Sequence, residues 1–220
     1  MKVLITLVFL VISSMSLAHP GFVSLSDLCP EINAGMNYAT TDNFTGQVVA
    51  GYKAQKALMA KGPAEALCRV ISEAKRRGLG IKIFDCYRPA KAVAFFQAWA
   101  KMPETNPELK KLHYPEYTRE QLFDLGYIAK QSSHSKGSAV DLTLFDLETG
   151  RDLDMGTGFD YFGELSHTDN LGVTAGQRKN RYLLKELMEG QGFKNFSQEW
   201  WHYSYKPEPY PDTYFDFDVE

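Results

Sequence analysis

Helical and strand patterns follow one another irregularly along this chain, and that order is the feature that most limits its fold. Helical signals cover 63–77, 90–101, 118–129 and 174–189, whereas strand patterns cover 81–87, 139–145 and 193–205. No internal repeat or low-complexity block occurs. We therefore predict an α+β fold, a single domain with a mainly antiparallel sheet flanked by helices.

Particular residues mark where these elements begin and end. Pro63 suits the first turn of a helix, and Gly78 follows its basic last turn and stops it. Pro89 ends the strand at 81–87 and suits the start of the next helix. Thr118 begins a capping-box pattern. The segment 103–115 is polar and punctuated by prolines, so we expect a loop there.

The first 18 residues have the pattern of a secretory signal. Lys2 precedes the apolar run Val3–Ile12, and Ser16-Leu17-Ala18 forms a small-residue cleavage site. The run is shorter than the roughly twenty apolar residues that span a bilayer. We predict cleavage after Ala18, no stable membrane anchor, and an exported protein that is periplasmic if the host has an outer membrane.

The chain accordingly divides into a signal at 1–18, a domain at 19–206 and an acidic C-terminal arm at 207–220. We expect the arm to be solvated, with its tyrosines and phenylalanines lying partly on the domain.

Composition narrows the class of partner. The chain has 44% apolar and 23% charged residues, which is typical of a globular protein and excludes a collagen-like fibre or a multi-pass membrane protein. A net charge of -3 provides no basic surface for nucleic acid or anionic lipid. We expect a small molecule or a peptide as partner.

Three cysteines are too few for a disulfide scaffold. In an oxidising compartment Cys29 and Cys68 could pair, while Cys86, inside an apolar strand, stays a thiol. Spacing alone leaves the other combinations open, including three buried thiols.

The first segment with chemical potential runs from Ser132 to Asp141. Side chains alternate along a strand, so Val140 and Leu142 face the core while Asp141 faces a site or solvent. His134 lies seven residues before Asp141, so the two can act together only if the chain bends near Gly137. Taken alone, an exposed aspartate and a loop histidine would explain the segment.

The second segment is Glu199-Trp200-Trp201-His202. In a strand, side chains an odd number of residues apart point to opposite faces. The Glu199 carboxylate and the His202 imidazole can therefore converge only across a helical turn or a bend. Packing against indoles would raise the pKa of Glu199 toward the value that a general base or acid needs. Taken alone, an aromatic core patch would explain this segment.

Together the two segments offer a ligand set for a metal. His134, Asp141 and His202 supply two nitrogens and one carboxylate oxygen, a plausible set for catalytic Zn²⁺ with the fourth position left to water. Glu199 remains as the carboxylate that would deprotonate that water. His113 and His167 lie in polar segments and receive no metal role.

Two motifs carry a resemblance to a known family: Ser133-His134-x-x-Gly137-x-Ala139-x-Asp141 and Glu199-Trp200-Trp201-His202. They resemble the D-alanyl-D-alanine dipeptidases, the VanX-like branch of the zinc D,D-peptidases. Blocks at 38–46, 85–89 and 155–160 also resemble that family, in its order. The metal motif is shared with carboxypeptidase relatives and sonic-hedgehog-like domains, whereas the blocks at 38–46 and 155–160 are more specific to the dipeptidase branch.

The resemblance implies roles for the residues of the metal motif. It implies one zinc held by His134, Asp141 and His202, with Glu199 as general base and then proton donor. It also implies that Arg88 stabilises the oxyanion on the scissile carbonyl, where loss of a donor typically costs roughly 3 to 4 kcal/mol.

The resemblance also implies how a dipeptide is bound. Because a dipeptide is a zwitterion, its pocket should present an anion to the ammonium group, and Asp160 with Tyr38 resembles that end of the family's site. Ser132 lies two residues before His134, on the same face if the backbone is extended, and could hydrogen bond the substrate.

We therefore predict zinc-dependent hydrolysis of D-Ala-D-Ala to two D-alanines. One alternative is a D,D- or L,D-carboxypeptidase acting on longer peptidoglycan peptides. Such an enzyme would need a pocket that is open at the amine end of the substrate, whereas Asp160 and Tyr38 imply that this end is closed. The other is a non-catalytic zinc-containing wall-binding domain, which the presence of Glu199 beside a complete ligand set disfavours.

The secretory signal is the clearest departure from the best-known relatives, which deplete a cytoplasmic dipeptide pool. An exported enzyme cannot reach that pool. We expect a scavenging role instead, in which D-Ala-D-Ala released outside the inner membrane is cleaved for uptake.

Overall fold

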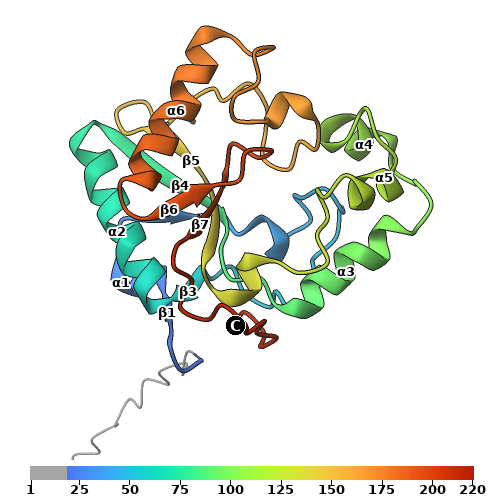
Figure 1. Cartoon of the computed structure of the whole chain (residues 1–220), viewed down its shortest axis with the longest axis horizontal. Helices are drawn as coiled ribbons and strands as arrows, with labels where there is room; N and C mark the ends of the chain where they lie inside the picture. The colour runs from blue at the N-terminus through green and yellow to red at the C-terminus, as the bar shows by residue number, and fades with distance from the viewer. Residues whose placement is uncertain (1–18) are drawn as a thin grey trace, which may run out of the picture.

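A five-stranded sheet forms the centre of the protein (Figure 1). The structure is a computed structural model that describes residues 19–220, so the predicted signal at 1–18 lies outside the described residues. The strands, in their order across the sheet, are β2 (Asn33–Ala34), β4 (Leu79–Asp85), β5 (Ala139–Asp146), β7 (His202–Tyr205) and β6 (Phe193–Asn195). The β2–β4 pair is parallel and the other three pairs are antiparallel, which confirms the predicted sheet.

A smaller antiparallel sheet pairs β1 (Phe22–Ser24) with β3 (Leu58–Ala60). The helices are α1 (Leu25–Leu28), α2 (Lys61–Arg76), α3 (Ala90–Ala100), α4 (Pro107–His113), α5 (Arg119–Asp124) and α6 (Ala175–Glu189), with 3-10 turns η1 (Asn37–Ala39), η2 (Ser133–Lys136) and η3 (Glu164–Ser166). Within residues 19–220, no helix combines the length and apolar character needed to cross a membrane.

The helices form two groups on either side of the central sheet (Figure 1). α2 and α6 contact each other and pack on β4 and β6. The predicted apolar face of α2 is buried there, with Leu67 and Val70 fully inaccessible to solvent. α3, α4 and α5 gather on the other side. Val93 and Phe96 of α3 line a pocket there. The α+β class is therefore confirmed.

Three local predictions were wrong in detail. The segment 103–115 contains α4, because the Asn106 side chain accepts a hydrogen bond from the Leu109 backbone and caps that helix. The capping box of α5 forms as predicted, but the helix ends at Asp124 rather than near residue 129. The strand expected at 193–205 is interrupted between β6 and β7.

The C-terminal arm packs on the domain more closely than expected. Val219 is fully buried and pairs with Tyr52 in a parallel bridge. The chain end lies beside β1 and β3 (Figure 1). The aromatic side chains of the arm lie partly buried on the domain, as expected, whereas the burial of Val219 was not predicted for a solvated arm.

Strand register brings three polar residues into one row. Asp141 of β5 lies opposite Asp85 of β4 on one side and His202 of β7 on the other. The register shifts between Ile83 and Asp85, so Phe84 is an extra residue in β4. In a regular strand Asp85 would point to the same face as Ile83, toward the core. The irregularity turns Asp85 to the face that carries Asp141.

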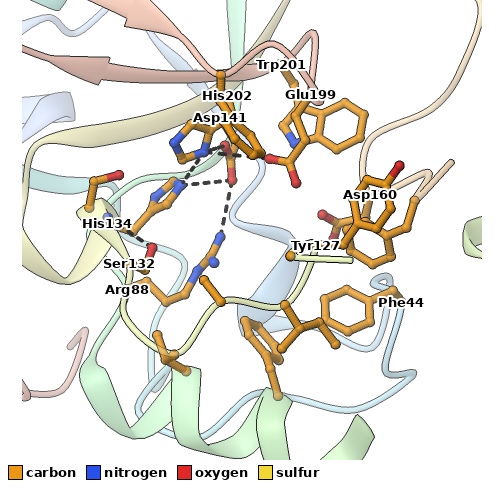
Figure 2. Close-up of a pocket in the computed structure, with 18 of the residues that line it drawn as sticks. Phe44, Arg88, Tyr127, Ser132, His134, Asp141, Asp160, Glu199, Trp201 and His202 are labelled. Atoms are coloured by element: carbon orange, nitrogen blue, oxygen red, sulfur yellow. Dashed lines mark hydrogen bonds and ion pairs between the residues drawn. The ribbon is translucent and has the colours of Figure 1, made fainter. Parts of the chain in front are cut away.

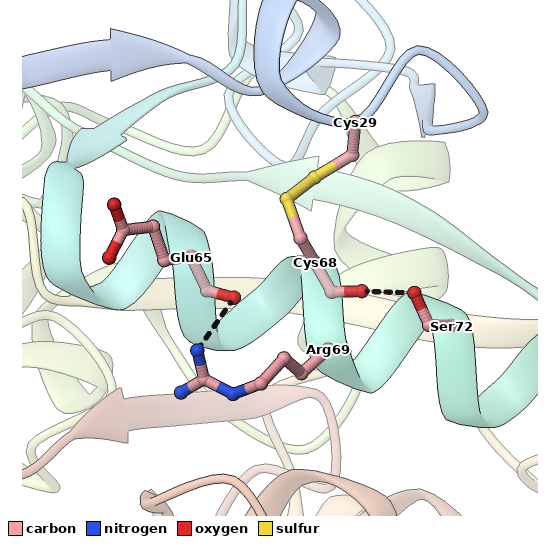
Figure 3. The surroundings of a disulfide bond; sticks show 5 residues. All are labelled: Cys29, Glu65, Cys68, Arg69 and Ser72. Atoms are coloured by element: carbon pink, nitrogen blue, oxygen red, sulfur yellow. Dashed lines mark hydrogen bonds between the residues drawn. A yellow bond between two sulfur atoms is a disulfide. The ribbon is translucent and has the colours of Figure 1, made fainter.

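A disulfide joins Cys29, just after α1, to Cys68 in α2 (Figure 3). This is one of the pairings that the sequence left open, and Cys86 is a buried free thiol. The bond closes a loop over a sequence separation of 39 residues. Crosslinks of this kind stabilise a folded domain by about 2–4 kcal/mol.

Candidate active site

Three side chains from three segments converge on one point (Figure 2). Ligand-type atoms of His134, Asp141 and His202 all lie within 4.8 Å of one another. His134 Nε2 is 3.2 Å from an oxygen of Asp141, and His202 Nδ1 is 3.0 Å from the other oxygen. The three predicted ligands are thus brought together, and they form a group that could hold a metal ion.

A bend at Gly137 makes this convergence possible. His134 lies in η2, and Gly137 ends that turn with a φ of 69° before β5 begins. A Cβ at this position would lie 2.4 Å from the ring of Phe22, so a side chain would meet both strain and a clash. The bend expected from the sequence is therefore present, and glycine is required there.

Each histidine has an outer partner that fixes its ring. His134 Nδ1–H donates to the backbone oxygen of Cys86 at 2.5 Å, which leaves Nε2 free as a ligand. In His202 the nitrogen that faces the group is Nδ1, and its Nε2 lies 3.3 Å from the hydroxyl of Ser204. The Ser204 hydroxyl in turn lies 2.9 Å from that of Ser133. A pair of serines therefore contacts the side of the His202 ring that points away from Asp141.

Arg88 is held beside the ligand group by two buried carboxylates. Its Nε donates to Asp85 at 2.9 Å and its Nη2 donates to Asp141 at 3.2 Å. The Tyr52 hydroxyl donates to the other oxygen of Asp85 at 2.7 Å. The guanidinium also lies 5.0 Å from the ring centre of Tyr38. These contacts fix the guanidinium at the edge of the cavity.

Glu199 lies in the turn between β6 and β7, where the His202 backbone N–H donates to its carbonyl at 3.2 Å. The turn realises the predicted convergence, with the Glu199 carboxylate 3.8 Å from His202 Nδ1. Burial and the charge of Asp141 raise the pKa of Glu199 to about 8, against the opposing effect of Arg88. A carboxyl group with this pKa can both accept and return a proton near neutral pH.

Asp160 and Tyr38 meet at another part of the cavity. The Tyr38 hydroxyl donates to Asp160 Oδ2 at 2.8 Å, and both residues are buried. Burial and the charge of Asp141 raise the pKa of Asp160. Its backbone is left-handed, with a φ of 57°, and His113 Nδ1–H donates to its carbonyl at 3.1 Å. A cationic group of a ligand would stabilise the ionised form of this buried carboxyl.

The cavity has a volume of about 190 Å³. That is below the roughly 300–1,000 Å³ of pockets for drug-sized ligands, so it suits a smaller molecule. Ser132 lines it, although its hydroxyl also caps η2 by accepting from the His134 backbone N–H. The apolar lining includes Phe44, Val93, Phe96, Ile128, Ala129, Phe162, Phe196 and Trp201.

Several supporting residues were missed by the sequence analysis. Asp85 lies in the family-like block at 85–89 but received no role, and its partner Tyr52 carried no signal in the sequence. Tyr127 lines the cavity and its hydroxyl lies 3.1 Å from His167 Nε2. His167 and His113 thus support the cavity from behind, and neither belongs to the ligand group.

Comparison with known proteins gives a consistent result. A family model described as D-ala-D-ala dipeptidase matches residues 18–220. Proteins named D-alanyl-D-alanine dipeptidase are similar to the chain. The one from Enterococcus faecium is 42% identical over 200 residues, covering 91% of this chain and 98% of that protein. The one from Streptomyces coelicolor is 42% identical over 198 residues, covering 90% and 98%. The one from Escherichia coli is 36% identical over 181 residues, covering 82% of each.

The serine pair yields a prediction about metal affinity. Ser204→Ala removes the hydroxyl that lies 3.3 Å from His202 Nε2, so we expect the dissociation constant for Zn²⁺ to rise by about tenfold. Competition with a chromogenic chelator measures it. Ser204→Thr keeps a hydroxyl and should retain more of the affinity. Ser72→Ala on α2, which removes a hydroxyl bonded to the Cys68 carbonyl, is the control. Unchanged affinity in Ser204→Ala would show that the pair does not orient His202.

Proposed function

The chain belongs to the D-Ala-D-Ala dipeptidase family of metallopeptidases, and from this premise we propose that it hydrolyses D-Ala-D-Ala to two D-alanines with one bound zinc ion. The observation that carries the proposal is the pairing of two sites in one small cavity. The ligand group, Glu199 and Arg88 supply hydrolytic chemistry, and the buried Asp160 supplies an anion for a substrate ammonium.

The ligand group fits zinc by its donor set. Two imidazole nitrogens and one carboxylate oxygen are typical of catalytic zinc with an open position. Both rings have outer hydrogen-bond partners, as zinc-binding histidines do. When bound there, zinc would lower the pKa of water to about 7 and polarise a carbonyl.

Glu199 is the proposed proton carrier. It takes a proton from the attacking water as the water oxygen bonds to the scissile carbonyl carbon. The same proton goes to the leaving nitrogen as the C–N bond breaks, which yields two amino acids. Burial favours the return of the proton, because it disfavours the charged carboxylate relative to the neutral acid.

Arg88 is the proposed oxyanion donor. Negative charge develops on the carbonyl oxygen as water attacks. A guanidinium that is already held in place can stabilise this charge with little reorganisation. Its ion pairs with Asp85 and Asp141 fix its position before substrate arrives.

Asp160, Tyr38 and Ser132 are the proposed substrate-binding residues. The ammonium group of a dipeptide would lie against Asp160, whose partner in the structure is the neutral hydroxyl of Tyr38. The small volume and aromatic lining favour a dipeptide over a longer peptide at this end. Ser132 would hydrogen bond the remainder of the substrate from the ligand side of the cavity.

Release of free D-alanine by the purified protein tests the proposed function. We expect cleavage of D-Ala-D-Ala that a chelator abolishes and added zinc restores. N-acetyl-D-Ala-D-Ala should react far more slowly because it lacks the ammonium group that Asp160 binds, and L-Ala-L-Ala provides the stereochemical control. Cleavage of a cell-wall pentapeptide in preference to the dipeptide would instead establish a carboxypeptidase.

A Glu199→Gln substitution tests the proton carrier. The amide keeps the shape of the carboxyl group but cannot accept the proton, so kcat should fall by about 10²–10⁴-fold. Zinc affinity should change little, because Glu199 is not in the ligand group. Circular dichroism and chelator competition provide the controls. A variant that retains the parent kcat would refute this role.

We further propose that the protein is exported and scavenges D-Ala-D-Ala outside the inner membrane. The signal-like pattern at 1–18 and the Cys29–Cys68 disulfide support export, since disulfides persist mainly in oxidising compartments. Fractionation of host cells should recover a mature chain that begins at His19 outside the cytoplasm. Recovery of the full-length chain in the cytoplasm alone would contradict export.

A further inference from the structure

Residues 207–220 run back across the domain after β7, and we call this segment the strap. Its five charged side chains are all acidic, yet its aromatic side chains pack on the domain. Phe217 stacks on Tyr87 with ring centres 4.1 Å apart and on His19 at 4.3 Å. Phe215 packs edge-on against Phe22 at 5.0 Å. These rings fix the path of the strap.

The first contact of the strap is with Tyr87, which lies between two residues of the site in the sequence. The Tyr87 hydroxyl donates to the backbone oxygen of Phe217 at 2.9 Å. Tyr87 stands between Cys86, whose carbonyl accepts from His134, and Arg88, which donates to Asp141. A displacement of Tyr87 would therefore move both the Cys86 carbonyl that binds His134 and the guanidinium of Arg88.

The second contact joins two site segments through one residue. The Phe215 N–H donates to the Ser135 carbonyl at 2.8 Å, and the Phe215 carbonyl accepts from the Ala90 N–H at 2.9 Å. Ser135 directly follows His134, and Ala90 lies two residues after Arg88. Both backbone groups of Phe215 are thus used to hold η2 against the start of α3.

The third contact holds the segment 51–54, which includes the hydrogen-bond partner of Asp85. Val219 donates to the Gly51 carbonyl at 2.8 Å, and its own carbonyl accepts from the Lys53 and Ala54 backbone N–H groups. Tyr52, in the middle of that segment, donates to Asp85. The strap therefore fixes the segment that supplies the hydrogen bond to Asp85.

We propose that the strap is a positioning element of the active site, which holds the segments of His134, Arg88 and Tyr52 in the arrangement that binds metal and stabilises the oxyanion. This inference rests on the proposed function. The residues proposed for the ammonium group, Tyr38 and Asp160, lie on other segments. Loss of strap contacts should therefore lower metal affinity and kcat more than it raises KM.

Three substitutions in the full-length chain test the proposal. Phe217→Ala removes the ring stacked on Tyr87, Phe217→Leu keeps apolar bulk there, and Tyr87→Phe deletes only the hydroxyl that bonds the strap. The control is Leu187→Ala, which removes a buried side chain of α6 on the other face of the sheet. Thermal unfolding, kcat, KM and the Zn²⁺ dissociation constant are measured for each.

We expect Phe217→Ala to lower kcat and raise the Zn²⁺ dissociation constant by about tenfold each, with KM within about threefold of the parent. Tyr87→Phe should change kcat and the Zn²⁺ dissociation constant in the same directions but by a smaller factor. Phe217→Leu should retain more of the parent kcat and metal affinity than Phe217→Ala does. Leu187→Ala should lower thermal stability while keeping the parent kcat and metal affinity.

Two outcomes would overturn the proposal. One is a loss of stability in the strap variants with the parent kcat and metal affinity. The other is an equal loss of kcat in Leu187→Ala, which would trace the effect to general destabilisation. If Phe217→Ala does not fold, Tyr87→Phe decides by the same criteria. If the parent does not cleave D-Ala-D-Ala, the proposed function fails, while the metal affinities still test the strap.

Discussion

The guanidinium of Arg88 compensates two buried carboxylates, and the rest of the site depends on this arrangement. Asp85 and Asp141 face each other across β4 and β5, and each is at most 1% exposed. Two carboxylates so close repel each other, and burial deprives them of water. Arg88 binds both carboxylates. His134 contacts the same oxygen of Asp141 as Arg88 does, and His202 contacts the other oxygen. One charge cluster therefore fixes the geometry of the ligand group and the position of Arg88, the proposed oxyanion donor.

Much of this site could be predicted from local sequence. Its predicted ligands lie in short motifs, and their position along a strand decides which face of the sheet they occupy. The side of β5 that carries Asp141 and the bend at Gly137 follow from alternation and from the conformational freedom of glycine. The place of Asp85 does not follow, since the extra residue at Phe84 reverses its direction and depends on pairing with β5. The path of the C-terminal arm was missed for a related reason: its acidic composition is local, whereas the rings that bind Phe217 come from distant segments.

The two parts of the cavity are supported in different ways. The ligand group rests largely on paired strands, which hold it through backbone hydrogen bonds. The part that contains Asp160 rests on loops, whose backbone is held by side chains such as His113. Tyr127 and His167 link two further loops through a contact between their side chains. Loops tolerate changes in length and sequence better than paired strands do. Substrate selection can therefore vary within this architecture while the hydrolytic chemistry stays fixed.

The strap also has a consequence for timing. It follows every other described element in the chain, so the ribosome makes it after all the segments that it joins. A nascent chain that has reached β7 already contains His134, Asp141, Glu199 and His202, but lacks the contacts of Phe215, Phe217 and Val219. If the strap positions the site, such a chain holds the chemistry without its final geometry. Synthesis of the strap, and its docking on the domain, then precede the appearance of full activity.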